Sequence, residues 1–130
     1  MRDMVLPSFA MDCRDWLVNT PAEAGLPDEV GGAPLLAVLS TVLLDAGDFV
    51  PASGVLTVGL LDEDVPAARC LGAGCVAREL LDADVNGLRY LLPAPEAPLA
   101  LLAEFHAPEG PDARIVARVG ALMRSFRWAA

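Results

Sequence analysis

Residues 86–128, NGLRYLLPAPEAPLALLAEFHAPEGPDARIVARVGALMRSFRW, carry the sequence pattern that decides the fold. Every second residue is apolar in 88–92 and again in 99–105, which is typical of strands with one buried face. The proline-rich segment 93–98 predicts a rigid connection between the two strands. The pattern therefore predicts an antiparallel β-hairpin.

An amphipathic helix is predicted to follow this hairpin. Gly110, Pro111 and Asp112 form a typical start, because proline fits the first turn and an acidic side chain is favoured near the positive end of the helix dipole. The helix would end near Arg124 and Arg127, where cations are favoured. An apolar stripe at helical spacing predicts that it packs on the sheet. The members of this stripe are Ile115, Val116, Val119, Leu122, Met123 and Phe126.

Three further strands are predicted before the hairpin, at 34–44, 55–61 and 76–81. The periodicity of 34–44 fits a short helix about equally well, and we favour a strand. Leu102 is apolar although it lies on the second face of the 99–105 strand. We therefore expect the sheet to be covered on both faces, with a helix on each side.

A short helix is predicted in the N-terminal part of the chain. Thr20 and Glu23 fit a capping box, with Pro21 at the first helical position. Gly25 and Pro27 would end this helix within two turns. It is the expected second helix of the fold.

The composition is typical of one globular domain, which we expect to span residues 1–130. Hydrophobic residues make up 55% of the chain and aromatic residues only 5%, so leucine, valine and alanine must fill the core. The expected class is α+β. An antiparallel sheet of about five or six strands would carry the C-terminal helix on one face and the short N-terminal helix in addition.

We expect a cytoplasmic protein without a membrane-spanning segment. The longest apolar run, 33–44, has about half the length that a bilayer requires. Asp3, Pro7 and Asp12 interrupt the N-terminal segment, so no secretory signal is expected. The oligomeric state stays open, and a homodimer is one of the alternatives.

The net negative charge of the chain comes entirely from its first half. Residues 1–64 hold eleven acids and two arginines, whereas residues 65–130 hold seven of each. This distribution disfavours nucleic acids and anionic membranes and would attract a cationic partner. A solubilising role explains the same charge. The candidate partner-binding residues are Asp45, Asp48, Asp62, Glu63 and Asp64.

One segment resembles the start of a calcium loop. Asp82, Asp84 and Asn86 have the spacing of the first EF-hand ligands, with Gly87 at the bend. The twelfth position, however, is Pro93 instead of a glutamate. Asn-Gly between apolar segments is also a strong hairpin signal. We therefore favour a turn and expect no metal, although Asp82, Asp84 and Asn86 remain the candidates.

The segment 70–77 contains a second partial motif. Gly72, Gly74 and Ala77 match one variant of the dinucleotide-binding loop, but the surrounding βαβ pattern is missing. We therefore favour a glycine-rich turn and expect no cofactor. A hairpin loop at 71–74 would place Cys70 opposite Cys75 at bridging distance, although a reducing compartment disfavours a disulfide.

Catalytic residues are not indicated by any complete motif. His106 is the single histidine, which excludes sites built from several histidines. No G-x-S-x-G elbow surrounds any of the four serines, and the chain has no lysine for a Walker motif. Trp16 and Trp128 are expected to be buried anchors. We predict that the chain is not an enzyme.

The segments NGLRYLLPAP at 86–95, LLAEFHAP at 101–108 and SFRW at 125–128 together resemble a known pattern. They are similar to the end of uncharacterised actinobacterial proteins that resemble the PsbP-like α/β/α sandwich. The resemblance implies a fold used mostly by non-enzymatic binders. These include photosystem extrinsic subunits, a Ran-binding factor and chaperones of type VI secretion effectors.

The function expected from these observations is non-enzymatic protein binding. The domain would act as an adaptor or chaperone, for example of a secreted effector, through its acidic half or an exposed sheet surface. Three alternatives stay open. They are an acidic immunity-type inhibitor of a basic toxin, a small-molecule or lipid-binding domain, and an enzyme with an unrecognised site.

Overall fold

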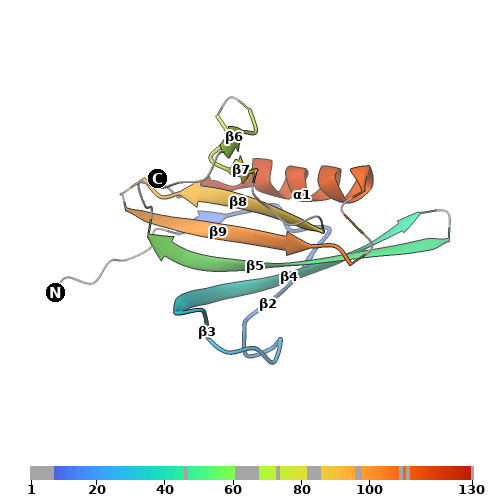
Figure 1. Ribbon diagram of the computed structural model, residues 1–130, viewed down its shortest axis with the longest axis horizontal. Helices are drawn as coiled ribbons and strands as arrows, with labels where there is room; N and C mark the ends of the chain where they lie inside the picture. The colour runs from blue at the N-terminus through green and yellow to red at the C-terminus, as the bar shows by residue number, and fades with distance from the viewer. Residues whose placement is uncertain are drawn as a thin grey trace.

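The structure is a computed structural model that describes residues 8–45, 47–60, 68–72, 74–81, 86–95, 98–108, 110 and 112–129. It is mostly β, with 52% of the chain in strands and 13% in helix (Figure 1). The strands are β1 (Phe9–Ala10), β2 (Leu17–Asn19), β3 (Glu29–Val30), β4 (Ala33–Asp45), β5 (Asp48–Leu60), β6 (Ala68–Cys70), β7 (Arg78–Leu80), β8 (Gly87–Pro93), β9 (Leu99–His106) and β10 (Arg127–Trp128). The helix α1 spans Ala113–Ser125.

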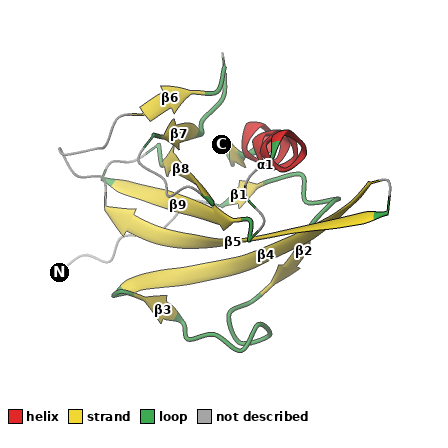
Figure 2. Cartoon of the chain, turned by 45° about the vertical axis from the view of Figure 1, so that its right-hand side comes forward, coloured by secondary structure: helices red, strands yellow, loops and turns green. Residues whose placement is uncertain are grey.

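The main sheet is antiparallel and has the strand order β2-β4-β5-β9-β8-β7-β6, with β3 paired to β4 off this path. A separate small sheet joins β1 to β10. Within the described part of the chain, α1 is the single helix, and it lies over one face of the main sheet (Figure 2). We call this the inner face and the opposite one the outer face.

The long hairpin of β4 and β5 forms because both segments are rich in valine and leucine, and β-branched valine favours strands. Asp45 pairs with Asp48 across the turn, where Gly47 has a φ of +87° that few other residues adopt easily. The prediction that 34–44 is a strand is therefore confirmed. The hairpin predicted from strands 88–92 and 99–105 is confirmed. It consists of β8 and β9, which pair from Gly87 opposite His106 to Pro93 opposite Ala100.

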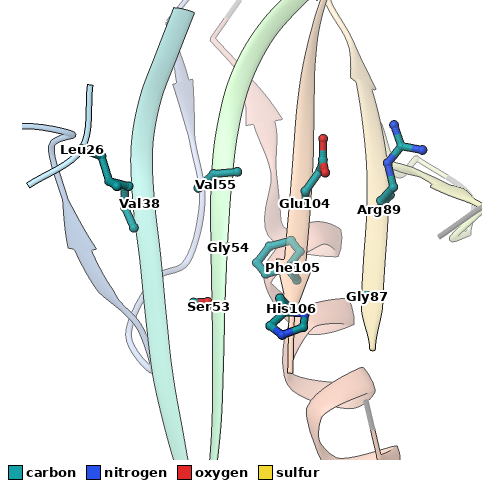
Figure 3. A pocket seen from close by; sticks show the side chains of 10 residues that line it. All are labelled: Leu26, Val38, Ser53, Gly54, Val55, Gly87, Arg89, Glu104, Phe105 and His106. Atoms are coloured by element: carbon teal, nitrogen blue, oxygen red, sulfur yellow. The ribbon is translucent and has the colours of Figure 1, made fainter. Parts of the chain in front are cut away.

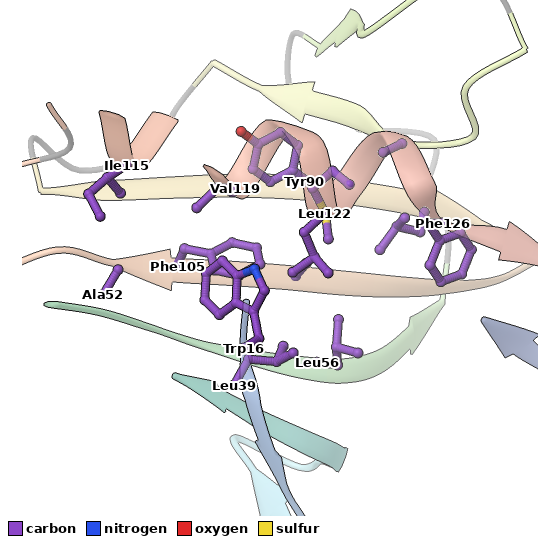
Figure 4. Packing of buried hydrophobic residues seen from close by; sticks show 14 of the residues in the cluster. Trp16, Leu39, Ala52, Leu56, Tyr90, Phe105, Ile115, Val119, Leu122 and Phe126 are labelled. Carbon is purple, nitrogen blue, oxygen red and sulfur yellow. The ribbon is translucent and has the colours of Figure 1, made fainter. Parts of the chain in front are cut away.

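The hydrophobic core lies between the inner face and α1 (Figure 4). Phe105 of β9 is at its centre, with its ring 5.5 Å from that of Trp16 and 6.1 Å from that of Tyr90. Trp16 is buried as expected, and Trp128 is half-buried. The side chains that fill the layer include Leu39, Leu56, Leu92, Leu101, Val119, Leu122 and Met123, all with at most 2% of their surface exposed.

The helix α1 begins at Ala113, directly after the predicted start at Gly110-Pro111-Asp112, so the prediction of a proline in its first turn is wrong. Asp112 is its N-cap and accepts hydrogen bonds from the backbone N–H groups of Arg114 and Ile115. The predicted stripe packs on the sheet, except for Val116, which is 40% exposed. No helix in the described residues has the length and apolar character needed to cross a membrane.

Aromatic stacking closes the end of the core beyond α1. Phe126 stacks on Phe9 with ring centroids 5.2 Å apart, and Trp128 packs edge-on against both rings. The indole N–H of Trp128 donates to the carbonyl of Pro93 at 2.8 Å. These contacts hold β1 and β10 against the end of the main sheet.

The predicted N-terminal helix is wrong, and with it the α+β sandwich with a helix on each face. The capping box does form, because Thr20 N–H donates to Glu23 Oε1 and Glu23 N–H donates to Thr20 Oγ1. The chain then makes a turn instead of a helix, and Gly25 adopts a φ of +71°. One capped turn has too few hydrogen bonds to offset the cost of helix nucleation, and no apolar stripe follows it.

Two other predicted boundaries are also corrected. Pro51 and Gly54 lie inside β5 and do not precede it, since the strand starts at Asp48. The expected Asn86-Gly87 turn is not the hairpin loop, because Leu80 pairs with Arg89 and Gly87 already pairs with His106. Asn86 is a turn residue before β8, and residues 82–85 lie outside the described residues.

Gly54 allows Phe105 to cover β5. A Cβ atom at Gly54 would lie 2.5 Å from Cδ1 of Phe105, whereas a Cβ atom at Gly59 would meet nothing within 4 Å. We predict that Gly54→Ala lowers the free energy of unfolding by about 1–3 kcal/mol through overpacking. Gly59→Ala, in the same strand, should leave it unchanged or raise it by up to about 1 kcal/mol. Urea unfolding compares the two, and equal effects would contradict the packing of Phe105.

Burial raises the pKa of Tyr90 to about 12, and the charge of Glu79 adds to this effect. Tyr90 is the single tyrosine, so absorbance at the phenolate band reports it alone. The folded protein should therefore titrate near pH 12 and the denatured chain near its ordinary pKa of about 10. Because the folded state keeps a proton that the unfolded state releases, the free energy of unfolding should fall between those pH values. Tyr90→Phe should remove this decrease in the free energy of unfolding. A titration midpoint near 10 for Tyr90 in the folded protein would contradict the raised pKa.

Candidate functional site

The outer face of the sheet is defined by the strand register. Val38, Val55, Glu104 and Arg89 lie directly opposite one another on β4, β5, β9 and β8. Cross-strand partners share a face of the sheet. Their neighbours in the chain, such as Phe105, point to the buried inner face. This row therefore lies on the face that α1 does not cover.

Part of the β4–β5 hairpin projects beyond the rest of the sheet (Figure 1). The pairing of β2 with β4 reaches Ser40, and the pairing of β9 with β5 reaches Ser53. Residues 41–45 and 48–52 therefore pair only with each other among the described strands. We call this two-stranded extension the ribbon.

Exposed apolar side chains gather on the outer face of the ribbon. Leu44 and Phe49 are cross-strand partners and are 68% and 70% exposed, and Val42, opposite Pro51, is 51% exposed. Leu17 is 61% exposed and lies opposite Ser40 on β2, at the base of the ribbon. We call Leu17, Val42, Leu44 and Phe49 the ribbon patch.

The inner face of the ribbon is anchored to the core. Val50 and Ala52 are each only 4% exposed. Thr41, which is buried, donates a hydrogen bond from Oγ1 to the carbonyl of Asp15 at 2.7 Å and accepts one from Arg118 Nη1 at 2.9 Å. Arg118 also donates to the carbonyl of Val42 at 3.3 Å. These bonds hold the base of the ribbon against α1, so the patch keeps a fixed orientation.

An open groove lies next to the ribbon on the outer face (Figure 3). It has a volume of about 380 Å³. Leu26, from the loop between β2 and β3, forms its apolar side together with Val38 and Val55. Ser53, Glu104, His106 and Arg89 supply its polar side.

The polar groups of the groove do not form catalytic geometry. Ser53 lies opposite His106, and Glu104 shares the outer face two residues earlier. All three side chains are exposed. Within the described chain, no hydrogen bond links the serine to the histidine or the histidine to the glutamate. A serine nucleophile requires such a bonded base to be activated.

The acidic candidates are placed as follows. Asp48 is exposed at the tip of the ribbon, and Asp45 is its cross-strand partner. Asp62, Glu63, Asp64, Asp82 and Asp84 lie outside the described residues. Asn86 precedes β8, and its carbonyl accepts a hydrogen bond from Ala107 N–H. The residues that the structure describes contain no cluster of three metal-ligating side chains.

The glycine-rich segment connects two short strands. Gly72 and Gly74 lie between β6 and β7, where a dinucleotide loop would lead into a helix. The prediction of a plain turn agrees with this arrangement. Cys70 pairs with Arg78 and not with Cys75, and the described cysteines are free thiols. The loop therefore does not bring Cys70 and Cys75 opposite each other in the sheet.

The ribbon patch was missed by the sequence prediction. The run 33–44 indicates a strand that is buried on both faces, and its length gives no sign that it outlasts its neighbours. The available signal was that Val42 and Leu44 lie two residues apart and therefore share one face of the strand. They do so at an end of the strand for which no neighbouring strand was predicted. Asp45 and Asp48, which were selected for their charge, did mark the tip of the same hairpin.

Comparison with known proteins assigns neither a family nor a function to the chain. No family model matches the sequence, and the curated proteins and the solved structures contain no match either. Any function must therefore be proposed from the surface itself.

The hydrogen bonds of Thr41 are expected to stabilise the base of the ribbon. Thr41→Val removes the hydroxyl with little change of shape and leaves Arg118 and the Asp15 carbonyl without this partner. We predict a loss of about 1–3 kcal/mol in the free energy of unfolding. Thr57→Val is the matched control, because Thr57 is also buried in this hairpin but makes no hydrogen bond through its hydroxyl to the described residues. Chemical denaturation measures both, and equal losses would contradict the role of Thr41.

Proposed function

We propose that the chain is a non-enzymatic protein-binding domain, an adaptor or chaperone, that contacts its partner through the ribbon patch. The observation that carries the proposal is the exposure of Val42, Leu44 and Phe49 on one face of a projecting, well-anchored ribbon. Contiguous apolar patches on a small protein commonly mark interaction sites. Aromatic side chains such as Phe49 frequently act as the anchors of interfaces.

The enzyme alternative has less support. A serine, a histidine and a glutamate do share the outer face, but they are exposed and not hydrogen-bonded to one another. Active sites usually hold such groups in a water-excluding pocket that shifts their pKa values. The polar side of the groove is better explained as the rim of an interface.

The alternative of a lipid-binding layer also has less support. The interface between α1 and the inner face is filled by Leu101, Val119, Leu122 and Met123, which are almost completely buried. A lipid chain would have to displace these side chains from a close-packed core. The outer face offers apolar surface without such a cost.

Site-specific photo-crosslinking tests the proposal. A photoreactive phenylalanine analogue in place of Phe49 should form a discrete product with one partner protein in the native cells. The same analogue in place of Val116, which is exposed on α1, should not. The purified partner should then bind the unmodified chain in calorimetry, and Leu44→Ser should weaken this binding by about 30-fold or more, since hot-spot truncations cost about 2 kcal/mol or more.

The same experiment can contradict the proposal. Capture of the partner through position 116 and not through position 49 would place the interface on α1. Binding that is unchanged by Leu44→Ser would show that the ribbon patch does not contribute. The Val116→Ser variant controls for the loss of any exposed apolar side chain.

A further inference from the structure

We propose that a small cleft beside α1 binds a zwitterion, namely a free α-amino acid with an apolar side chain. The cleft lies between α1 and the turn at 12–16 that precedes β2, on the opposite side of the sheet from the ribbon patch. We call it the α1 cleft. Its volume is about 260 Å³, slightly below that of pockets for drug-sized ligands. Asp12, Asp15 and Trp16 line it from the turn, and Arg118, Ala121 and Leu122 line it from α1.

The two walls of the α1 cleft are joined at two points. Near the end of α1, the backbone N–H of Asp12 donates to Ser125 Oγ at 2.9 Å. Farther along, the carbonyl of Asp15 accepts a hydrogen bond from Thr41, and the hydroxyl of Thr41 accepts one from Arg118. The walls are therefore held in place before a ligand arrives, which lowers the entropic cost of binding.

Arg118 has a free edge that matches a carboxylate. Its hydrogen bonds to Thr41 and to the carbonyl of Val42 both use Nη1. The Nε–Nη2 edge of the guanidinium makes no bond to the described residues, and none of their acidic groups forms an ion pair with Arg118. Two parallel N–H groups on one edge bind a carboxylate in a bidentate manner, which is among the strongest polar contacts. We therefore place the ligand carboxylate at this edge.

The indole N–H of Trp16 is a second unused donor in the α1 cleft. The side chain is only 9% exposed, and its ring packs against Phe105 on the core side (Figure 4). Its N–H makes no hydrogen bond to the described residues, whereas the N–H of Trp128 donates to the carbonyl of Pro93. No fully buried polar side-chain atom in the described chain lacks a partner, so the N–H of Trp16 reaches solvent. A ligand carboxylate can accept from it as well as from Arg118.

Asp15 selects a ligand that also carries a positive charge. Arg14 bonds Asp12 through two nitrogens, at 2.9 and 3.1 Å, and lowers the pKa of this carboxyl, so these two charges offset each other. The exposed carboxylate of Asp15 makes no hydrogen bond or ion pair with the described residues. One cation, Arg118, and one anion, Asp15, thus remain for a ligand. A phosphate would be repelled by the two aspartates, whereas an α-amino acid satisfies both remaining charges.

The rest of the α1 cleft is apolar. Ala121 is exposed on α1, and Leu122 and the indole of Trp16 lie beside it. An apolar side chain of the ligand would remove this surface from water. A charged side chain would find no opposite charge among the described lining residues that is not already used. The α1 cleft therefore favours an apolar amino acid over a basic or acidic one.

The indole NMR signals of the two tryptophans test this inference. L-leucine, L-methionine and L-phenylalanine are each titrated to about 10 mM into the isotope-labelled protein. At least one should shift the indole signal of Trp16 and saturate with a Kd of about 1 mM or lower. The signal of Trp128, which is already bonded to Pro93, should stay in place. Absence of a saturable shift at Trp16 with all three amino acids would overturn the inference.

Analogues that lack one of the two charges test the requirement for a zwitterion. For leucine these are isocaproate, which has no ammonium group, and isoamylamine, which has no carboxylate. Each should bind at least tenfold more weakly than the amino acid, because a hydrogen-bonded charge is lost. Equal binding of isocaproate would contradict the role of Asp15, and equal binding of isoamylamine would contradict that of Arg118. Either result would overturn the inference.

Variants separate the two charged side chains. Arg118→Lys keeps the charge but loses the bidentate edge, and it should weaken binding of the amino acid at least tenfold. Asp15→Asn should weaken it at least fivefold and leave isocaproate binding unchanged or tighter. Arg124→Lys, on the same helix but outside the α1 cleft, is the matched control and should have no effect.

Circular dichroism of each variant checks that the fold is intact. If Arg118→Lys does not fold, Asp15→Asn decides the test. Amino-acid binding that a folded Arg118→Lys or Asp15→Asn variant leaves unchanged would overturn the inference. These results do not bear on the ribbon patch, so the proposed protein-binding function stands or falls separately.

Discussion

The packing of α1 against the inner face is the interaction on which the rest of the structure depends. A single helix of 13 residues supplies one apolar stripe, and that stripe covers one face of the sheet. Its residues meet Phe105 and Tyr90, whose rings fill the centre of the layer. The outer face around Val42, Leu44 and Phe49 consequently remains open to solvent or to a partner. The ribbon patch and the groove are on that face because the inner one is already occupied by α1.

A second consequence follows from the unequal lengths of the strands. β4 and β5 have 13 residues each, but β9 has eight and β2 has three. The extra length has no neighbour in the sheet, so it becomes the ribbon. Arg118 and Thr41 stiffen its base from the helix side, and this leaves the leucine and phenylalanine side chains of the other face displayed in a defined direction.

The sequence allowed the C-terminal hairpin and helix to be predicted because their signals are local. Alternation in 88–92, the acidic Asp112 near the helix start and the stripe from Ile115 all act within a few residues, and the hairpin and the helix were confirmed, with Val116 as the exposed exception in the stripe. The helix near Thr20 was wrong because a correct cap does not supply enough turns. The extension of β5 back to Asp48 was missed because Pro51 and Gly54 normally break strands. Pro51 is tolerated where β9 has ended, and Gly54 is required beneath Phe105.

The candidate site was harder to predict because exposure is a property of the assembled sheet. Val42 and Leu44 have the same spacing as buried strand residues, and they are exposed because they lie on the face that α1 does not cover, beyond the point where β2 ends at Ser40. Asp45 and Asp48 could be selected from charge alone, and they mark the tip of the ribbon. The apolar part of the surface could be found only once the strand register was known.

Because side chains alternate along the ribbon, the residues on its two faces are under different evolutionary constraints. Val50 and Ala52 point inward, so changes at these positions are constrained by the core. Val42, Leu44 and Phe49 point outward and contribute little to folding, because they are already exposed. Their identities can therefore drift, or adapt to a new partner, without loss of the fold. The two-residue period of a strand thus gives this domain a surface whose specificity can evolve independently of its stability.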